Sequence, residues 1–229
     1  MIQNHPFRLV VFDVDGTLVD SQSGIIAAMS RAFEAEALDA PEAEAIRRIV
    51  GLSLDEAVAR LLPSAVNAAL VERVAEGYRQ AFIALRSRGD YREPLYPGAR
   101  EAVAALNVGE VCLGIATGKN LRGLRVTLDR HDLAPHFATL QTADGGPGKP
   151  HPRMLLDAMA EVGAEPEETV FIGDTVFDME MAVNARTTAL GVDWGYHGGD
   201  ELRAMGARAV LDTFDELPEA LVKLGEGAP

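Results

Sequence analysis

The chain of 229 residues is long enough to bury a core without disulfides or a structural metal. Hydrophobic residues make up 48% of it and charged residues 24%, which excludes a disordered, collagen-like or coiled-coil chain. Because 21 Lys and Arg residues stand against 35 Asp and Glu residues, the net charge is −14 and no nucleic-acid partner is expected.

The apolar runs and the single cysteine indicate the compartment. No run approaches the roughly 20 apolar residues that a membrane span needs, so no membrane partner is expected. The N-terminal residues do not have the pattern of an export leader, so we expect no export. Cys112 lies in an apolar run, where we expect a buried, inert thiol. One cysteine forms no internal disulfide, which favours a reducing compartment, and we expect a cytoplasmic protein.

Short β-branched runs alternate with helical patterns along most of the chain. The runs predict buried strands at residues 8–13, 111–116, 169–172, 188–192 and 207–211. The helical patterns lie at residues 99–106, 121–131, 152–162, 176–185 and 214–224. Because strand and helix alternate from about Tyr96 onward, we predict an α/β fold with a Rossmann-like parallel sheet and helices on both faces.

Residues 20–91 differ from the rest because they are almost strand-free. Apolar residues recur there at helical spacing, among them Met29, Val66, Tyr78 and Phe82, and prolines and glycines divide the segment into about four helices. This pattern predicts a helical cap domain at 20–91, inserted into a discontinuous α/β core of residues 1–19 and 92–229. Residues 225–229 are typical of a frayed tail.

The strongest motif is Asp-Val-Asp-Gly-Thr-Leu at residues 13–18, directly after the first predicted strand. Ligands of open α/β sheets bind beyond the carboxyl ends of the strands, so Asp13 and Asp15 are delivered to the expected site. Gly16 permits a tight turn that directs main-chain N–H groups toward an anion. A simple turn is the alternative interpretation, because Asp and Gly favour turns.

A second strand also ends in glycine and an acid, at Gly173-Asp174, with Asp178 one helical turn later. Both acids are expected to face one crevice. Asp174 alone is equally well interpreted as a helix N-cap.

Two further strand-end segments supply a hydroxyl and an ammonium group. Thr117 ends the strand at 111–116 and precedes Gly118 and Lys119, while Lys149 lies in a Gly-Lys-Pro segment. Beside the carboxylates, these groups would bind a phosphoryl group and balance charge. Thr117 as a helix cap and Lys149 as a solvated loop lysine remain the alternatives.

In the order and spacing of these four motifs, the chain resembles the haloacid dehalogenase superfamily. The resemblance covers nearly the whole chain and is closest to phosphatases with an inserted helical cap of the C1 type, such as the phosphoglycolate phosphatase group. It implies a Mg²⁺-dependent phosphatase that hydrolyses a small-molecule phosphomonoester, similar to 2-phosphoglycolate, through an aspartyl-phosphate intermediate.

The resemblance also implies a role for each matched residue. Asp13 would be the nucleophile, and Asp15 would protonate the leaving group and then activate water. Lys149 and Thr117 would stabilise the transferred phosphoryl group. Its oxygens would also be bound by Gly16, Thr17, Gly118 and Lys119.

A Mg²⁺ ion would be held by carboxylates of Asp13 and Asp174 and by the main-chain carbonyl of Asp15. Asp178 would orient a metal-bound water or Lys149. The partner would be a small phosphorylated metabolite, while the oligomeric state, monomer or dimer, stays open.

Other activities of this scaffold remain as alternatives. Inorganic pyrophosphate or a sugar phosphate would serve as substrate equally well. Mutases usually carry a histidine after the first motif, and residues 21–26 contain none. Metal-free dehalogenases lack the acid at Asp15, and a binding module would have lost a catalytic group. In the cap, Arg47 and Arg48 precede a turn at 51–53 that would reach substrate, or they are merely solvated.

Overall fold

The computed structural model describes residues 6–63, 67–107, 109 and 111–226. Val66 of the predicted helical pattern and residues 227–229 of the predicted tail lie outside these ranges. Among the described residues, no helix is both long and apolar enough to span a membrane.

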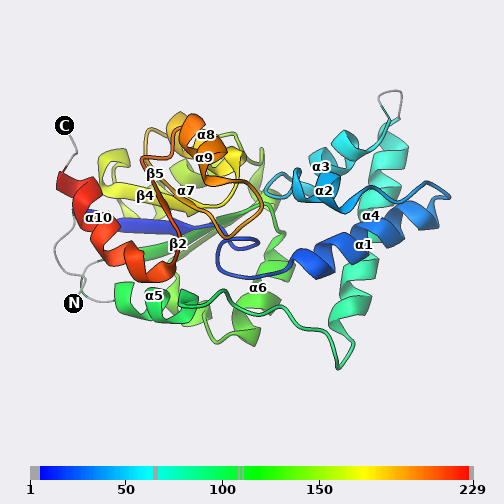
Figure 1. Ribbon diagram of the computed structural model, residues 1–229, viewed down its shortest axis with the longest axis horizontal. Coiled ribbons are helices and arrows are strands. Elements are labelled where there is room, and N and C mark those ends of the chain that lie inside the picture. The colour runs from blue at the N-terminus through cyan, green and yellow to red at the C-terminus, as the bar shows by residue number, and fades with distance from the viewer. Residues whose placement is uncertain (1–5, 64–66, 108, 110, 227–229) are drawn as a thin grey trace.

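A six-stranded parallel sheet forms the core, in the order β3-β2-β1-β4-β5-β6, which confirms the predicted fold class. Its strands are β1 (Leu9–Phe12), β2 (Cys112–Thr117), β3 (Thr139–Thr142), β4 (Thr169–Gly173), β5 (Thr188–Val192) and β6 (Ala209–Leu211). Phe12 is in register with Ile115 of β2 and Ile172 of β4. The carboxyl ends of these three strands therefore meet at one edge, beside the helices of residues 22–86 (Figure 1).

Helices cover both faces of the sheet, as predicted. Along β1, Val10 and Phe12 belong to one apolar cluster and Leu9 and Val11 to the other, because side chains alternate across a strand. The first face is covered by α5 (Ala99–Leu106), α6 (Leu121–Arg130) and α10 (Leu217–Glu226). The second is covered by α7 (Arg153–Val162), α8 (Val176–Asn184) and α9 (Gly199–Ala204), as Figure 1 shows.

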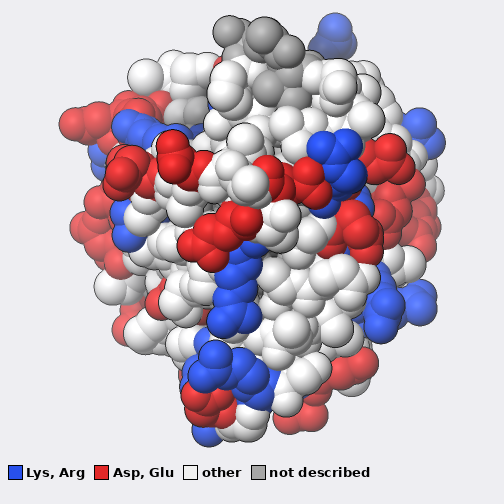
Figure 2. Space-filling model, turned by 90° about the vertical axis from the view of Figure 1, so that its right-hand side faces the viewer, with Lys and Arg blue, Asp and Glu red and all other residues white. Residues whose placement is uncertain are grey.

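Between β1 and β2 the chain forms a separate helical layer. Its helices are α1 (Gln22–Ala35), α2 (Ala43–Arg47), α3 (Leu54–Leu61) and α4 (Ala68–Arg86). They surround an apolar cluster of their own that includes Met29, Phe33 and Phe82. The layer lies within the predicted insertion, whose boundaries at 20 and 91 stay a prediction. Figure 2 views this end of the molecule, where acidic and basic side chains are interspersed.

Four details differ from the sequence-based expectations. Residues 225 and 226 of the predicted tail belong to α10, whose apolar face packs on the sheet. Strand β3 was not predicted, because Thr-Leu-Gln-Thr is short and polar, and the six-residue helix α9 was also missed. Cys112 is half-buried rather than buried. It is the first residue of β2, at the opposite end of the strand from the predicted site residue Thr117, and the other five residues of the strand are buried.

Candidate active site

Asp13 continues the line of β1 by one residue. Its main-chain amide donates a hydrogen bond to the carbonyl of Ile172 at 2.9 Å, which fixes the carboxylate at the sheet edge. The side chain is buried, and Oδ2 lies 2.9 Å from Lys149 Nζ. The other oxygen, Oδ1, is buried without a hydrogen-bond partner among the described residues. A buried acceptor of this kind requires a water, an ion or a ligand to satisfy it.

Lys149 is completely buried between two carboxylates. Its Nζ lies 2.9 Å from Asp13 Oδ2 and 2.6 Å from Asp178 Oδ1. Burial acts to lower the pKa of Lys149, but the charges of Asp13 and Asp178 outweigh it and raise the pKa above its usual value. Lys149 is therefore a charged ammonium group, and the alternative interpretation as a solvated loop lysine is wrong.

Asp174 is fixed by two donors at the end of β4. Thr17 Oγ1 donates to its Oδ1 at 2.8 Å, and the Tyr196 main-chain amide donates to its Oδ2 at 2.9 Å. Burial raises the pKa of Asp174 well above its usual value, and the charges of Asp178 and Asp13 add to the effect. Asp174 is not the N-cap of α8, because that position belongs to Thr175.

Asp178 lies in the first turn of α8, where the start of the helix holds its side chain. Its Oδ2 accepts hydrogen bonds from the Thr175 main-chain amide at 2.9 Å and hydroxyl at 2.7 Å, while Oδ1 is paired with Lys149. Both oxygens are thus engaged, and Asp178 positions Lys149 beside Asp13.

The donor set fits a hard dication. One carboxylate oxygen from each of Asp13, Asp174 and Asp178 lies within 4.8 Å of the others. Burial, together with the charge of Asp178, raises the pKa of Asp13 to about 6 against the lowering effect of the Lys149 charge. Three buried carboxylates around one ammonium leave excess negative charge in a low dielectric, which is unfavourable without a further cation. Carboxylate oxygens are the ligands that Mg²⁺ prefers.

The Asp15 side chain takes part in a separate ion pair. Ser21 Oγ donates to Asp15 Oδ1 at 2.6 Å, and Lys119 Nζ lies 3.0 Å from Oδ2. Burial acts to raise the pKa of Asp15, but the Lys119 charge and these hydrogen bonds, together with the charge of Arg86, lower it below its usual value. Asp15 is therefore ionised in this arrangement.

The other predicted site residues occupy two places. Thr117, Gly118 and Lys119 line a cavity beyond the sheet edge, and the Lys119 amide donates to Thr117 Oγ1 at 3.3 Å. Gly16 has φ +89° and packs directly against Asp174, which leaves no room for a side chain. Thr17 is buried with its hydroxyl on Asp174, so it orients that carboxylate. Phosphate binding by these five residues stays a prediction.

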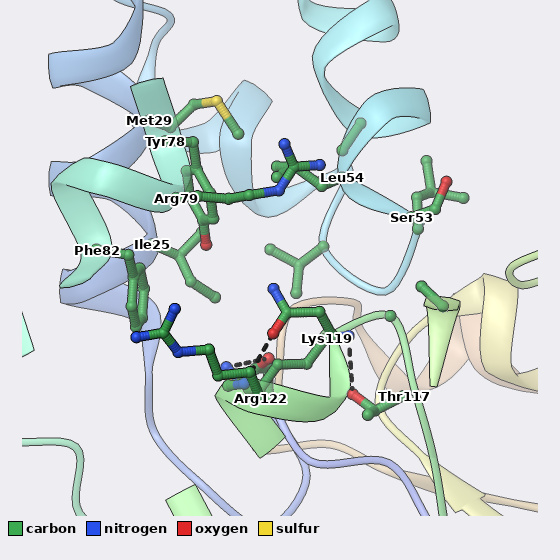
Figure 3. A pocket seen from close by; sticks show the side chains of 18 of the residues that line it. Ile25, Met29, Ser53, Leu54, Tyr78, Arg79, Phe82, Thr117, Lys119 and Arg122 are labelled. Carbon is green, nitrogen blue, oxygen red and sulfur yellow. Dashed lines mark hydrogen bonds and ion pairs between the residues drawn. The ribbon is translucent and has the colours of Figure 1, made fainter. Parts of the chain in front are cut away.

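The cavity has a volume of about 800 Å³ and lies between the sheet edge and the helical layer. Asp13 and Asp15 lie on its core side, and residues of α1, α4 and the 49–55 segment form the opposite wall. Figure 3 shows Tyr78, Phe82 and Ile25 across the space from Lys119 and Thr117. The two parts meet closely at Gly118, where an added Cβ would lie 2.5 Å from the carbonyl of Leu52.

The two cap arginines considered from the sequence do not line this cavity. Arg47 Nε donates to Gln22 at 2.8 Å, and Arg48 pairs with Glu201 at 2.8 Å. The turn at 51–53, however, does line it. Sequence reasoning missed Ser21 as a partner of Asp15; its place directly before α1, six residues after the acid, was the available signal.

A family model of haloacid dehalogenase-like hydrolases matches residues 10–192. The chain belongs to this family. It is 36% identical over 222 residues to a protein of Dickeya dadantii named probable phosphatase IndB, with 94% of this chain and 95% of that protein covered. It is 29% identical over 234 residues to the phosphoglycolate phosphatase of Salmonella choleraesuis, with 93% and 92% covered. The predicted family and the prediction of a hydrolase are thereby confirmed.

Solved structures give the same result for the fold of this haloacid dehalogenase-like hydrolase. A hydrolase from Pseudomonas syringae is 28% identical and superposes with a TM-score of 0.83, covering 93% of this chain and 97% of that one. A haloacid dehalogenase-like hydrolase from Bacteroides fragilis, at 24% identity, superposes with a TM-score of 0.84 over 92% and 99% of the two chains.

Proposed function

We propose that the chain is a Mg²⁺-dependent phosphatase that hydrolyses a small-molecule phosphomonoester through a phosphorylated Asp13. The observation that carries the proposal is the buried pair of Asp13 and Lys149, with Asp13 Oδ1 left without a partner at the cavity. The names of the relatives, phosphatase and phosphoglycolate phosphatase, support it and make 2-phosphoglycolate the reference substrate.

The reaction proceeds in two displacements. In the first, an Asp13 oxygen attacks phosphorus, the bond from phosphorus to the ester oxygen breaks, and the leaving alcohol takes a proton from Asp15. In the second, Asp15 takes a proton from water, whose oxygen attacks the aspartyl phosphate and releases inorganic phosphate and Asp13. Because Lys119 keeps Asp15 ionised, proton donation requires that the entering substrate draw Lys119 away from Asp15.

Asp13, Asp174 and the main-chain carbonyl of Asp15 would hold the Mg²⁺ ion. When bound, this ion neutralises charge on the carboxylates and on the phosphoryl group. Lys149 lies against Asp13 and offsets the charge that the nucleophile and phosphate share. Thr117, Gly118 and Lys119 would bind the phosphoryl oxygens from the end of β2.

The helical layer of residues 20–91 would act as a cap that shields the reaction from water. Its 51–53 turn lies so near Gly118 and Gly148 that an added Cβ would lie 2.5 Å from the Leu52 carbonyl at the first and 3.2 Å from the Ser53 Cβ at the second. Closure of this kind excludes bulk water and strengthens the electrostatic interactions inside. The cap side chains would then contact the part of the substrate that is not phosphate.

A phosphate-release screen tests the proposal. The panel contains 2-phosphoglycolate, inorganic pyrophosphate and sugar phosphates, each assayed with Mg²⁺ and with a chelator. We expect Mg²⁺-dependent release that is lost in Asp13→Asn and retained in Asp129→Asn, a change at an exposed carboxylate of α6. Robust turnover by Asp13→Asn would exclude Asp13 as the nucleophile. Halide release from 2-chloropropionate without metal, and no phosphate release, would favour the dehalogenase alternative.

A further inference from the structure

The cavity is large for the reference substrate. Its volume of about 800 Å³ lies in the range of about 300–1,000 Å³ that takes drug-sized ligands. The leaving group of 2-phosphoglycolate has only two carbon atoms and would contact a small part of the wall. The remaining wall is therefore available to a larger leaving group.

Apolar side chains make up much of that wall. Met29 of α1 and Phe82 of α4 lie on the cap side, as Figure 3 shows. Among the described residues, the large hydrophobic side chains that are clearly exposed are Ile83, Val126, Leu156 and Val183. Ile83 on α4 and Val126 on α6, each 43% exposed, both line the cavity. Exposed apolar surface on both sides of one cavity is typical of a site for a ligand with an apolar part.

Two polar groups in the cavity have no partner among the described residues. Arg122, in the first turn of α6, forms no ion pair or hydrogen bond through its guanidinium, unlike Arg79, which pairs with Asp55 at 3.3 Å. The Tyr78 hydroxyl likewise has no hydrogen-bond partner and points into the space in Figure 3. Burial raises the pKa of Tyr78, so this hydroxyl stays protonated and able to donate.

We propose that the cavity binds a leaving group with an apolar skeleton and a terminal anionic group, the skeleton lying between Ile83 and Val126 and the anion binding Arg122. This inference rests on the proposed phosphatase function and gives it a substrate class: phosphomonoesters of amphipathic alcohols that carry a carboxylate. The Tyr78 hydroxyl would donate a hydrogen bond to the same group. A guanidinium provides the planar donor fork that suits a carboxylate.

The test compares phosphate release from phenylpropyl phosphate, its para-carboxy derivative and 2-phosphoglycolate. The two aryl-alkyl esters release alcohols of similar structure. The ratio of kcat/KM for the carboxylated ester to kcat/KM for the uncarboxylated ester therefore reports binding of the carboxylate. We expect the carboxylated ester to have the highest kcat/KM. Arg122→Gln should lower the ratio about tenfold, as expected for loss of one hydrogen bond between charged groups. Tyr78→Phe should lower it about threefold.

Arg125→Gln is the matched control, because Arg125 is an exposed arginine of the same helix that does not line the cavity. The inference is wrong if 2-phosphoglycolate has the highest kcat/KM, or if Arg122→Gln moves the ratio no more than Arg125→Gln does.

Calorimetry with the non-hydrolysable carboxylated phosphonate separates the two proposals. If the phosphonate binds in a way that depends on Arg122 but no ester releases phosphate, the phosphatase function is refuted and the inferred ligand class is supported. If the phosphonate does not bind and no ester releases phosphate, both proposals are refuted.

Discussion

Replacing Lys149 by methionine removes the ammonium group but keeps much of the buried volume. The side chain is completely buried and pairs with Asp13 at 2.9 Å and Asp178 at 2.6 Å. Removing one partner of a buried ion pair costs about 3–5 kcal/mol, a large part of a typical unfolding free energy of about 5–15 kcal/mol. We therefore expect Lys149→Met to lower the free energy of unfolding by about 3 kcal/mol or more at pH 8 in chelator.

The pH dependence of this loss identifies its cause. Without the ammonium, the pKa of Asp13 rises above about 6, because Lys149 is the largest influence that lowers it. The folded variant then binds more protons than the unfolded chain, so its stability falls as the pH rises through the raised pKa. The difference from the wild type should accordingly shrink at pH 5, where the carboxyl is neutral.

Urea unfolding followed by circular dichroism measures both effects. Lys223→Met is the matched control, because Lys223 forms an exposed ion pair with Glu219 on α10, and it should leave the urea midpoint unchanged. Adding Asp178→Asn to Lys149→Met should recover part of the loss by removing one unpaired charge. A Lys149→Met protein within about 1 kcal/mol of the wild type at pH 8 would refute the buried ion-pair network.

Three further predictions concern the metal, the cap turn and the cap connection. Burial raises the pKa of Asp13 to about 6 and also raises the pKa of Asp174, so Mg²⁺ must displace protons from its ligands at low pH. Calorimetry should give an affinity that rises at least about tenfold per pH unit below about pH 6, and a flat profile would contradict this. Gly118→Ala should lower kcat/KM about tenfold or more, because the added methyl group would push the 51–53 turn away from the end of β2. Gly145→Ala is the control, since open space surrounds Gly145, and it should leave kcat/KM unchanged; equal effects of the two variants would exclude the close approach of Leu52 to Gly118. Arg86→Met should destabilise the fold by about 3 kcal/mol, because it removes the nearer partner of the buried Glu93 carboxylate, at 2.9 Å, and leaves only Arg130 at 3.7 Å. Urea unfolding should show no change for the exposed Arg88→Met, and similar midpoints for the two variants would argue against the Arg86–Glu93 pair.

The sequence predicted the core of this site because its residues lie at the ends of strands. Asp13 and Asp174 follow β-branched runs, and parallel strands bring their carboxyl ends to one edge whatever the rest of the chain does. The burial of Lys149 was not predicted, since a Gly-Lys-Pro loop has no periodic pattern that reveals its environment. Only the tertiary fold turns that loop between Asp13 and Asp178.

The ion pair of Asp15 with Lys119 was also beyond sequence reasoning. Both residues were expected at the site, as proton donor and phosphate ligand, but their contact depends on side-chain directions. The residues of the cavity wall could not be predicted for a similar reason. Tyr78 and Phe82 follow a helical pattern that predicts burial, but the pattern does not tell whether these side chains face the helical core or a ligand.

Detection of the covalent intermediate tests the central claim most directly. The enzyme would be mixed with Mg²⁺ and a phosphomonoester that carries a label on its phosphorus atom. The reaction would be quenched in acid, the protein digested, and the labelled peptide identified by mass spectrometry. We predict label on the peptide that contains Asp13, and more of it in Asp15→Ala, which should break the intermediate down slowly. Release of phosphate at the full rate with no label on that peptide would contradict the mechanism.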